Sequence, residues 1–206
     1  MSLNLHRLTI PSLAVIAICV TAVIAGWSLD TKLQSKSKTL AKSRTRNTVV
    51  ELEQITIANK EIKDKEAFSG GDDWLETLQF RVRNVSTKPI TYLELNINFP
   101  ETRSETSAMS SYVLRFGHKT PNQSLQKNLP LYIPVAATFD IRCSETYSSI
   151  KQFVEARKAM KNITQAELEV GWVMFEDKTA WAAGNFYKPD PTNPNRYINV
   201  GDTPSH

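Results

Sequence analysis

The chain has 206 residues, of which 41% are hydrophobic and 9% aromatic. This composition supplies enough apolar surface for one buried core and excludes a wholly disordered protein. Glycine is scarce, with seven residues in the chain, which argues against glycine-rich loops that cradle nucleotide phosphates.

The net charge of +4 is concentrated near the N-terminus. Segment 31–47 contains six basic residues and no acidic one. The chain has 25 basic and 21 acidic residues in total. Residues 1–47 contain seven of the basic residues, which are these six and Arg7, and one acidic residue, Asp30. Residues 48–206 therefore contain 18 basic and 20 acidic side chains. A nucleic-acid footprint is expected on the folded body itself, so we expect no nucleic-acid partner. The six basic residues are Lys32, Lys36, Lys38, Lys42, Arg44 and Arg46.

The first predicted element is a helix over residues 8–27, which contain no charged side chain. At about 1.5 Å per residue this stretch spans about 30 Å, the thickness of the hydrocarbon core of a bilayer. Two interpretations stay open. The segment is either a transmembrane anchor or a signal peptide cleaved near Ala25, where Val23 and Ala25 are acceptably placed for a signal peptidase.

Two rules disagree about the membrane orientation. The six basic residues after the apolar segment, against Arg7 before it, favour a cytoplasmic C-terminal side. A short basic N-terminus followed directly by an apolar segment is typical of export signals. We expect a single-pass membrane protein whose domain lies on the exported side, or a secreted domain after cleavage.

Changes in composition divide the chain into four parts. The polar, basic segment 29–47 is expected to be a tether, acting as a spacer or attracted to anionic headgroups. The four parts are an anchor or signal peptide over 1–28, the tether over 29–47, a β-rich domain over 48–188 and a Pro-rich tail over 189–206.

Two strands are predicted by strict alternation of apolar and polar side chains over 78–82 and 93–99. A period of two places one face in a core and the other in water. The polar stretch NVSTKP between them supplies turn residues, so we predict an antiparallel hairpin. The apolar positions are Leu78, Phe80, Val82, Leu93, Leu95, Ile97 and Phe99.

This strand–turn–strand stretch, over about residues 76–100, resembles the small immunoglobulin-like β-sandwich domains of bacterial exported or membrane-tethered proteins, such as the FxLYD-type domains. The resemblance implies that Asn84, Ser86, Lys88 and Pro89 form the turn between two sandwich strands and that Ile90 begins the second. Domains of this kind share no catalytic residues, so the resemblance implies no site.

Two further elements are predicted downstream. Apolar residues at helical spacing predict one helix over 148–162, with Ser149 and Gln152 at capping-box spacing. Segment 168–188 predicts a hairpin around the turn EDKT, with Phe175 opposite Ala180. Trp172 and Trp181 in this hairpin are interpreted either as core residues or as an aromatic binding platform.

Candidate chemistry is sparse. The two cysteines lie in different parts of the chain, Cys19 in the apolar segment and Cys143 in the β-rich domain. No intrachain disulfide is therefore expected to cross-link the domain. One nucleophile–base pair deserves testing: Cys143 with His118, which requires the two side chains within hydrogen-bond reach. The alternative is a half-buried thiol and a loop histidine. We expect no catalytic, cofactor-binding or metal site.

The sequence thus predicts a mainly β protein, an antiparallel immunoglobulin-like sandwich with one helix, preceded by a transmembrane or signal helix. The expected function is that of a non-enzymatic interaction or structural module of the cell envelope, which presents a sheet edge or the loop 101–110 to an unknown protein partner. The alternative is a thiol-dependent hydrolase that uses Cys143 and His118.

Overall fold

The computed structural model describes residues 36–119, 130–158 and 162–201. The predicted apolar helix over 8–27 lies outside these residues. Within the described ranges, no helix combines the length and hydropathy that a membrane span requires. The described part is mainly β, as predicted, and carries one α-helix among its elements.

The larger sheet has eight strands and is built around β9 (Gln165–Phe175). Strand β6 (Ile90–Phe99) lies along one side of β9, and β7 (Ser110–Gly117) follows β6. On its other side β9 pairs first with β1 (Lys36–Lys42) and then with β10 (Ala180–Ala182). The sheet is completed by β4 (Ala67–Gly70), β11 (Asn185–Asp190) and β12 (Asn193–Gly201).

The smaller sheet has four strands in the order β3-β2-β5-β8, all antiparallel. They are β2 (Val50–Ile57), β3 (Lys60–Glu61), β5 (Leu78–Asn84) and β8 (Thr138–Arg142). Among the described residues, short 3₁₀ turns lie between strands at Trp74–Thr77 and Pro100–Thr102, and a further one, at Cys143–Glu145, leads from β8 into the helix.

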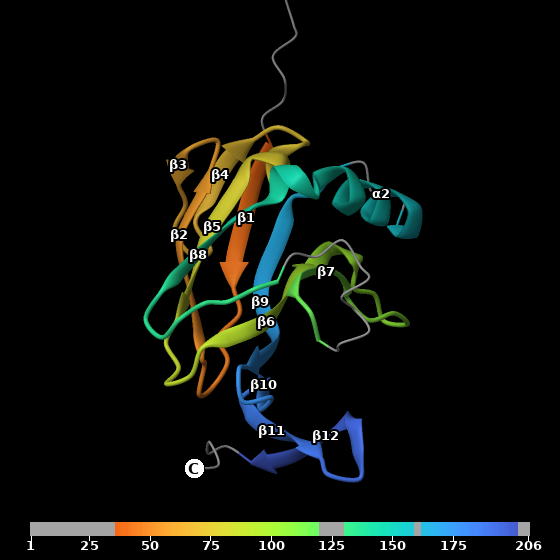
Figure 1. Ribbon diagram of the computed structural model, residues 1–206. Coiled ribbons are helices and arrows are strands. Elements are labelled where there is room, and N and C mark those ends of the chain that lie inside the picture. Colours follow the sequence, from red (N-terminus) through yellow and green to blue (C-terminus); the bar gives the residue numbers. More distant parts are fainter. Residues whose placement is uncertain (1–35, 120–129, 159–161, 202–206) are drawn as a thin grey trace, which may run out of the picture. The chain divides into compact units, whose positions relative to one another are not determined.

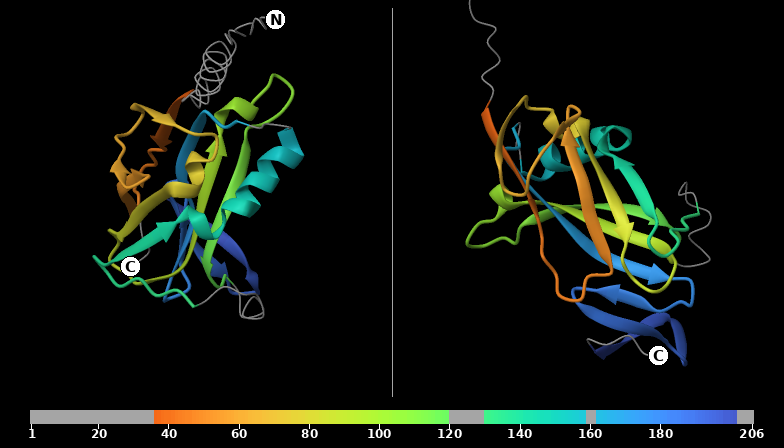
Figure 2. Two further views of the ribbon diagram at one scale, coloured as in Figure 1. Left: turned by 90° about the horizontal axis from the view of Figure 1, so that it is seen from above. Right: turned by 90° about the vertical axis from the view of Figure 1, so that its left-hand side faces the viewer.

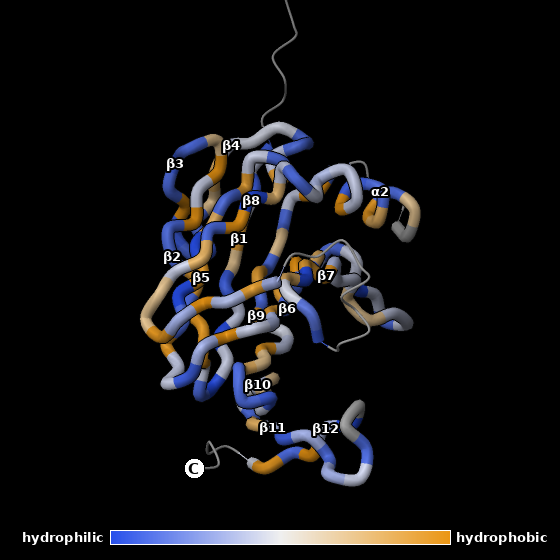
Figure 3. Tube along the Cα trace, viewed as in Figure 1, coloured by the Kyte–Doolittle hydropathy of each residue, from blue (hydrophilic) through white to orange (hydrophobic). Residues whose placement is uncertain are grey.

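The two sheets lie against each other and share one hydrophobic core (Figures 1 and 2). Phe80 and Val82 of β5 and Leu93 and Ile97 of β6 are almost completely buried in it. Alternation of hydrophobic and hydrophilic residues is visible along strands of both sheets (Figure 3), and in β5 and β6 it places one face of the strand in this core. The predicted inward-facing residues of both segments are therefore confirmed.

The predicted hairpin over 78–99 is wrong. Strands β5 and β6 flank the predicted turn, but β5 pairs with β2 and β8, whereas β6 pairs with β7 and β9. The NVSTKP turn thus carries the chain from one sheet to the other. Alternation alone identifies a half-buried strand without identifying its neighbour.

Part of the predicted tether is a strand. Residues 36–42 form β1, which pairs in parallel with β9 and makes the larger sheet mixed rather than purely antiparallel. Lys38 is fully buried, and its ammonium group donates to Asn162 Oδ1 at 2.6 Å and to the carbonyl of Ile163 at 3.0 Å. The aliphatic part of a lysine packs like an apolar side chain, so this basic segment still contributes to the core.

Part of the predicted tail is also ordered, since β11 and β12 pair antiparallel across 186–201. The preceding hairpin has a different register from the one predicted. Phe175 and Thr179 close a three-residue turn, Ala180 lies opposite Met174, and Trp181 lies opposite Val173. The turn is one residue shorter than expected, which shifts every cross-strand pair by one.

The predicted helix is confirmed as α2 (Tyr147–Lys158). It begins before the proposed capping pair Ser149 and Gln152, so that pair does not cap it. Ile150 and Val154 are buried, and Phe153 packs against Phe99 and Tyr112 with ring centroids 6.5 and 5.7 Å apart. The helix therefore covers core residues of β6 and β7.

Candidate functional site

The structure separates the predicted nucleophile–base pair. Cys143 directly follows β8, where Arg142 pairs with Gln79 at the start of β5. His118 directly follows β7, where Gly117 pairs with Tyr92 at the start of β6. Because β5 ends where the turn to β6 begins, the two side chains lie near opposite ends of β5, about 20 Å apart at 3.3 Å per residue.

Neither side chain is prepared for catalysis. Cys143 is fully buried, and burial raises the pKa of its thiol to about 12, whereas an attacking thiolate needs a lowered pKa. The Nδ1 atom of His118 is buried and makes no hydrogen bond to the residues that the structure describes. A nucleophile must contact its base, so the geometry disfavours the thiol hydrolase.

The two tryptophans of the predicted platform lie in different clusters. Trp181 is completely buried in the core between the sheets, beside Val173. Trp172 belongs to a second cluster, where it contacts Tyr187 and Tyr197 with ring centroids 5.1 and 5.3 Å apart. One shared aromatic platform is therefore excluded.

The register of the β9–β10 hairpin explains this separation: Trp181 lies opposite Val173 and shares its face, whereas Trp172, the neighbour of Val173, points to the other face.

A bulge interrupts β9 just before Trp172. Glu94 lies opposite Trp172, but the next residue, Leu95, lies opposite Val170, so Gly171 is the extra residue in β9. An inserted residue reverses which side chains face the core beyond it. Val170 and Val173 accordingly both face the core, although three positions separate them.

The loop that was expected to meet a partner is held against the start of β9. The carboxylate of Glu101 accepts hydrogen bonds from the backbone amides of Thr164 and Gln165, at 2.6 and 2.5 Å. Ser104 and Ser107 form an isolated bridge within the loop. Glu101 therefore anchors this loop to the sheet.

Exposed apolar side chains gather at another place, which we call the tip. Val85, Tyr132 and Val135 are 38, 57 and 48% exposed. Val85 begins the turn after β5, and the other two lie in a segment that is bonded to the end of β5 through Asn84. Clustered exposed apolar residues are typical of interaction surfaces.

Asn84 fixes the shape of the tip. Its side chain is completely buried and donates to the carbonyls of Lys88, Ile133 and Pro134 at 2.9–3.1 Å. Its Oδ1 atom accepts from the amide and hydroxyl of Ser86. One side chain thus holds together both segments that carry the exposed apolar residues.

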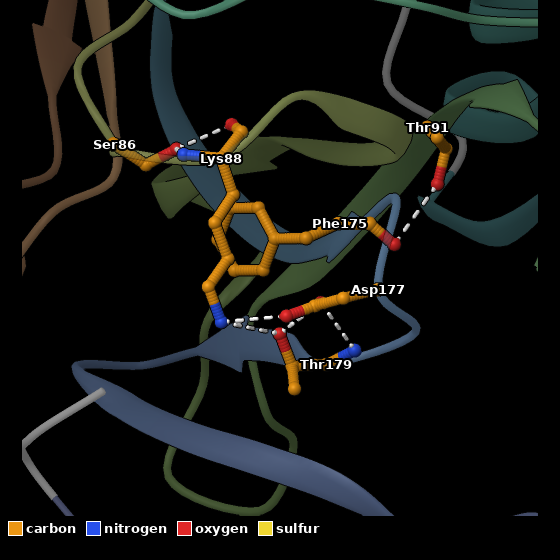
Figure 4. A network of polar contacts seen from close by, with 6 residues as sticks. All are labelled: Ser86, Lys88, Thr91, Phe175, Asp177 and Thr179. Carbon is orange, nitrogen blue, oxygen red and sulfur yellow. Dashed lines mark hydrogen bonds and ion pairs between the residues drawn. The ribbon is translucent and has the colours of Figure 1, made fainter. Parts of the chain in front are cut away.

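A polar network joins the tip to the turn after β9 (Figure 4). The Lys88 ammonium lies 2.7 Å from Asp177 Oδ2 and 3.3 Å from Thr179 Oγ1, and it lies over the Phe175 ring. Partial burial opposes ionisation of Asp177, but donors from Lys88 and Thr179 outweigh it and lower the pKa of this carboxyl group. Every polar group in the network has a partner, so its role is structural.

The sequence contains a signal for part of the tip. The NVSTKP stretch indicates the turn, and Asn84 and Ser86 are residue types that bond to nearby backbone groups. Tyr132 and Val135 follow no strand or helix period, and Val135 directly follows Pro134. Their exposure depends on the long-range bonds of Asn84, which no local pattern encodes.

A groove of about 600 Å³ opens between the end of β1 and the start of β2. Its apolar floor consists of Val50, Leu52 and Val170. Charged and polar residues line the rest: Lys42, Ser43, Arg44, Thr45, Thr48, Glu51, Glu53 and Asp64. The volume lies within the range that small ligands and peptide side chains occupy.

Within residues 36–119, 130–158 and 162–201, no three side chains of the His, Cys, Asp or Glu type are grouped so as to hold a metal ion. Comparison with known proteins assigns the chain to no group: no family model, no curated protein and no solved structure matches it.

Proposed function

We propose that this protein is a non-enzymatic, membrane-tethered or exported interaction module of the cell envelope, which binds a protein partner through the tip. The observation that carries this proposal is the group of exposed apolar side chains at Val85, Tyr132 and Val135 on a framework fixed by Asn84. Exposed apolar side chains on a rigid support are favourable for binding, because little conformational entropy is lost on association.

The direction of the strands supports this proposal. Strand β1 begins beside the start of β9, since Thr39 lies opposite Gln165. The turn at the tip is bonded to the other end of β9, where the amide of Glu176 donates to the carbonyl of Pro89. Lys36, the first residue that the structure describes, therefore lies at the end of the domain opposite the tip (Figure 1).

For the fold we propose an immunoglobulin-like sandwich related to the FxLYD-type domains. Support comes from the NVSTKP turn, which links strands of two facing sheets. For the N-terminus we propose that residues 8–27 form the membrane anchor, or a signal peptide cleaved near Ala25, and that the domain lies on the exported side. The charge-free length of this segment supports its insertion in a membrane.

Protease added to intact cells with a permeabilised outer layer tests the location. We expect digestion of the domain without lysis, and the mass of the mature N-terminus distinguishes an anchor from a cleaved signal. Protection until lysis would contradict an exported domain.

Site-specific photocrosslinking tests the binding surface. A photoreactive amino acid at position 132 or 135 of the full chain is expected to capture a discrete protein partner in cells. The same probe at Ile198, which is 38% exposed on β12, is the control. Capture that is equal from position 198, or that is absent from both tip positions in folded protein, would contradict this function.

A further inference from the structure

The first half of β2 has an open edge. Residues 50–53 pair with β5 on one side, and β3 covers the other side only at Thr56 and Ile57. Among the described residues, no strand pairs with the open side of residues 50–53. An open edge presents backbone donors and acceptors to an incoming strand.

The backbone groups that face this open side belong to Val50 and Leu52. The carbonyl of Val49 accepts from Val85 and therefore points toward β5. Because these directions alternate along a strand, Val50 and Leu52 point away from β5. Two side chains of the domain donate hydrogen bonds to the carbonyl oxygens of these residues. Thr48 Oγ1 lies 2.7 Å from the carbonyl oxygen of Val50, and Lys42 Nζ lies 3.4 Å from the carbonyl oxygen of Leu52.

The groove lies along this edge. The side chain of Val50 is 2% exposed and that of Val170 is 9% exposed, and both form the floor together with the half-buried Leu52. In a strand added beside β2, every second side chain would point into this floor. The groove therefore favours apolar residues at alternate positions of such a strand.

Charges on the outer face favour basic residues at the other positions. Glu51 and Glu53 of β2 both pair with the single guanidinium of Arg83 on β5, which leaves one negative charge uncompensated within this trio. Opposite charges on neighbouring strands are stabilising. A strand on the open side would lie next to the two carboxylates, so lysine or arginine is favoured there.

We propose that this groove binds an extended segment of a partner protein as an additional strand beside β2, with apolar and basic residues alternating along that segment. Backbone hydrogen bonds to Val50 and Leu52 supply affinity, and the alternating side chains supply specificity. On binding, the incoming strand displaces the Lys42 ammonium from the carbonyl of Leu52 and the Thr48 hydroxyl from that of Val50. The groove is separate from the tip, and this site does not require the tip to bind anything.

The test uses the full chain and two synthetic heptapeptides. One alternates lysine and valine, and the other carries glutamate in place of each lysine. Amide hydrogen exchange is measured residue by residue. At saturation with the lysine peptide, we expect exchange at Val50 and Leu52 to slow at least about tenfold, with little change at β7 and β12. Absence of protection at both residues with millimolar lysine peptide, or protection at another strand edge instead, would overturn the proposal.

Variants separate the charge contribution from the backbone contribution. The double variant Glu51→Gln, Glu53→Gln neutralises one exposed and one half-buried carboxylate and should weaken binding of the lysine peptide about three- to tenfold. Glu76→Gln, which alters an exposed carboxylate on the turn before β5, is the matched control and should bind like the parent. Equal affinity of the lysine and glutamate peptides for the parent chain would overturn the proposed selectivity for basic segments.

Discussion

At the scale of single residues, Asn84 is the most connected polar side chain of the tip. Replacement by alanine removes, from a fully buried position, an amide NH2 group whose two hydrogens serve three carbonyls and an oxygen that accepts two hydrogen bonds. We expect Asn84→Ala to lower the free energy of unfolding by about 2–4 kcal/mol, measured by urea denaturation. Asn185→Ala, which removes one long hydrogen bond to the carbonyl of Ala183 at 3.4 Å, is the control and should change stability by less than about 0.5 kcal/mol. Similar losses for both variants would contradict the assigned role.

The thiol of Cys143 gives a second test at this scale. Its pKa is raised to about 12 by burial, from an ordinary value of 9.0. Above pH 9 the unfolded chain releases this proton while the folded chain retains it, so stability falls as the pH rises from 9 toward 12. The loss approaches about 1.4 kcal/mol per pH unit within this window.

The measurement compares the parent with Cys143→Ala at pH 8 and pH 11, both in a Cys19→Ser background. The difference in unfolding free energy between them should shrink at high pH. A thiol reagent at neutral pH should modify Cys143 only on unfolding. Rapid labelling of the folded chain would instead support a thiol-dependent hydrolase that uses Cys143 and His118.

At the scale of secondary-structure elements, β1 is a part of the domain that looks like a linker. Its Leu40 is 2% exposed and its Lys38 is fully buried. A chain that starts at Lys36 should therefore unfold cooperatively on heating, whereas one that starts at Thr48 should lose its transition or melt more than about 10 °C lower. Circular dichroism measures both. Equal melting temperatures would show that β1 is dispensable.

The turn between β9 and β10 offers a gain of stability. Lys178 is its third residue and has a φ of 69°, a left-handed conformation that glycine adopts without steric cost. Lys178→Gly should raise the free energy of unfolding by about 0.5 kcal/mol, because the relief of steric strain in the folded chain exceeds the cost of the greater entropy of glycine in the unfolded chain. Lys178→Val should lower it, because β-branched residues avoid positive φ. Destabilisation by glycine would contradict the turn geometry.

At this scale the sequence predicts some features well and others poorly. Period-two alternation identifies the inward faces of β5 and β6, and helical spacing identifies α2. Alternation fails at Gly171 because one inserted residue exchanges the two faces of β9. Trp172 and Trp181 lie in different clusters for another reason: the turn is one residue shorter than predicted, so Trp181 lies opposite Val173 and faces away from Trp172. The partner of each strand depends on contacts distant in sequence, which local patterns do not report.

At the scale of the whole molecule, the same limit explains the missed first strand. Segment 36–42 is basic and polar, so its composition indicates a linker. It is a strand because Ile163 accepts from Lys38 and because β9 supplies a neighbouring edge. The tip and the groove were likewise not predictable as surfaces, since each combines segments from different regions of the chain. Composition did predict the mainly β class.

The parallel pairing of β1 with β9 also governs how the domain folds. Lys38 and its acceptor Ile163 are 125 positions apart in the chain, so the first strand waits for nearly the whole domain to be synthesised. Closing so long a loop costs conformational entropy before the contacts between its ends can stabilise the fold. Domains dominated by distant pairings therefore refold in about milliseconds to seconds. Until β9 is available, β1 therefore has neither a neighbouring strand nor the backbone acceptor of Lys38.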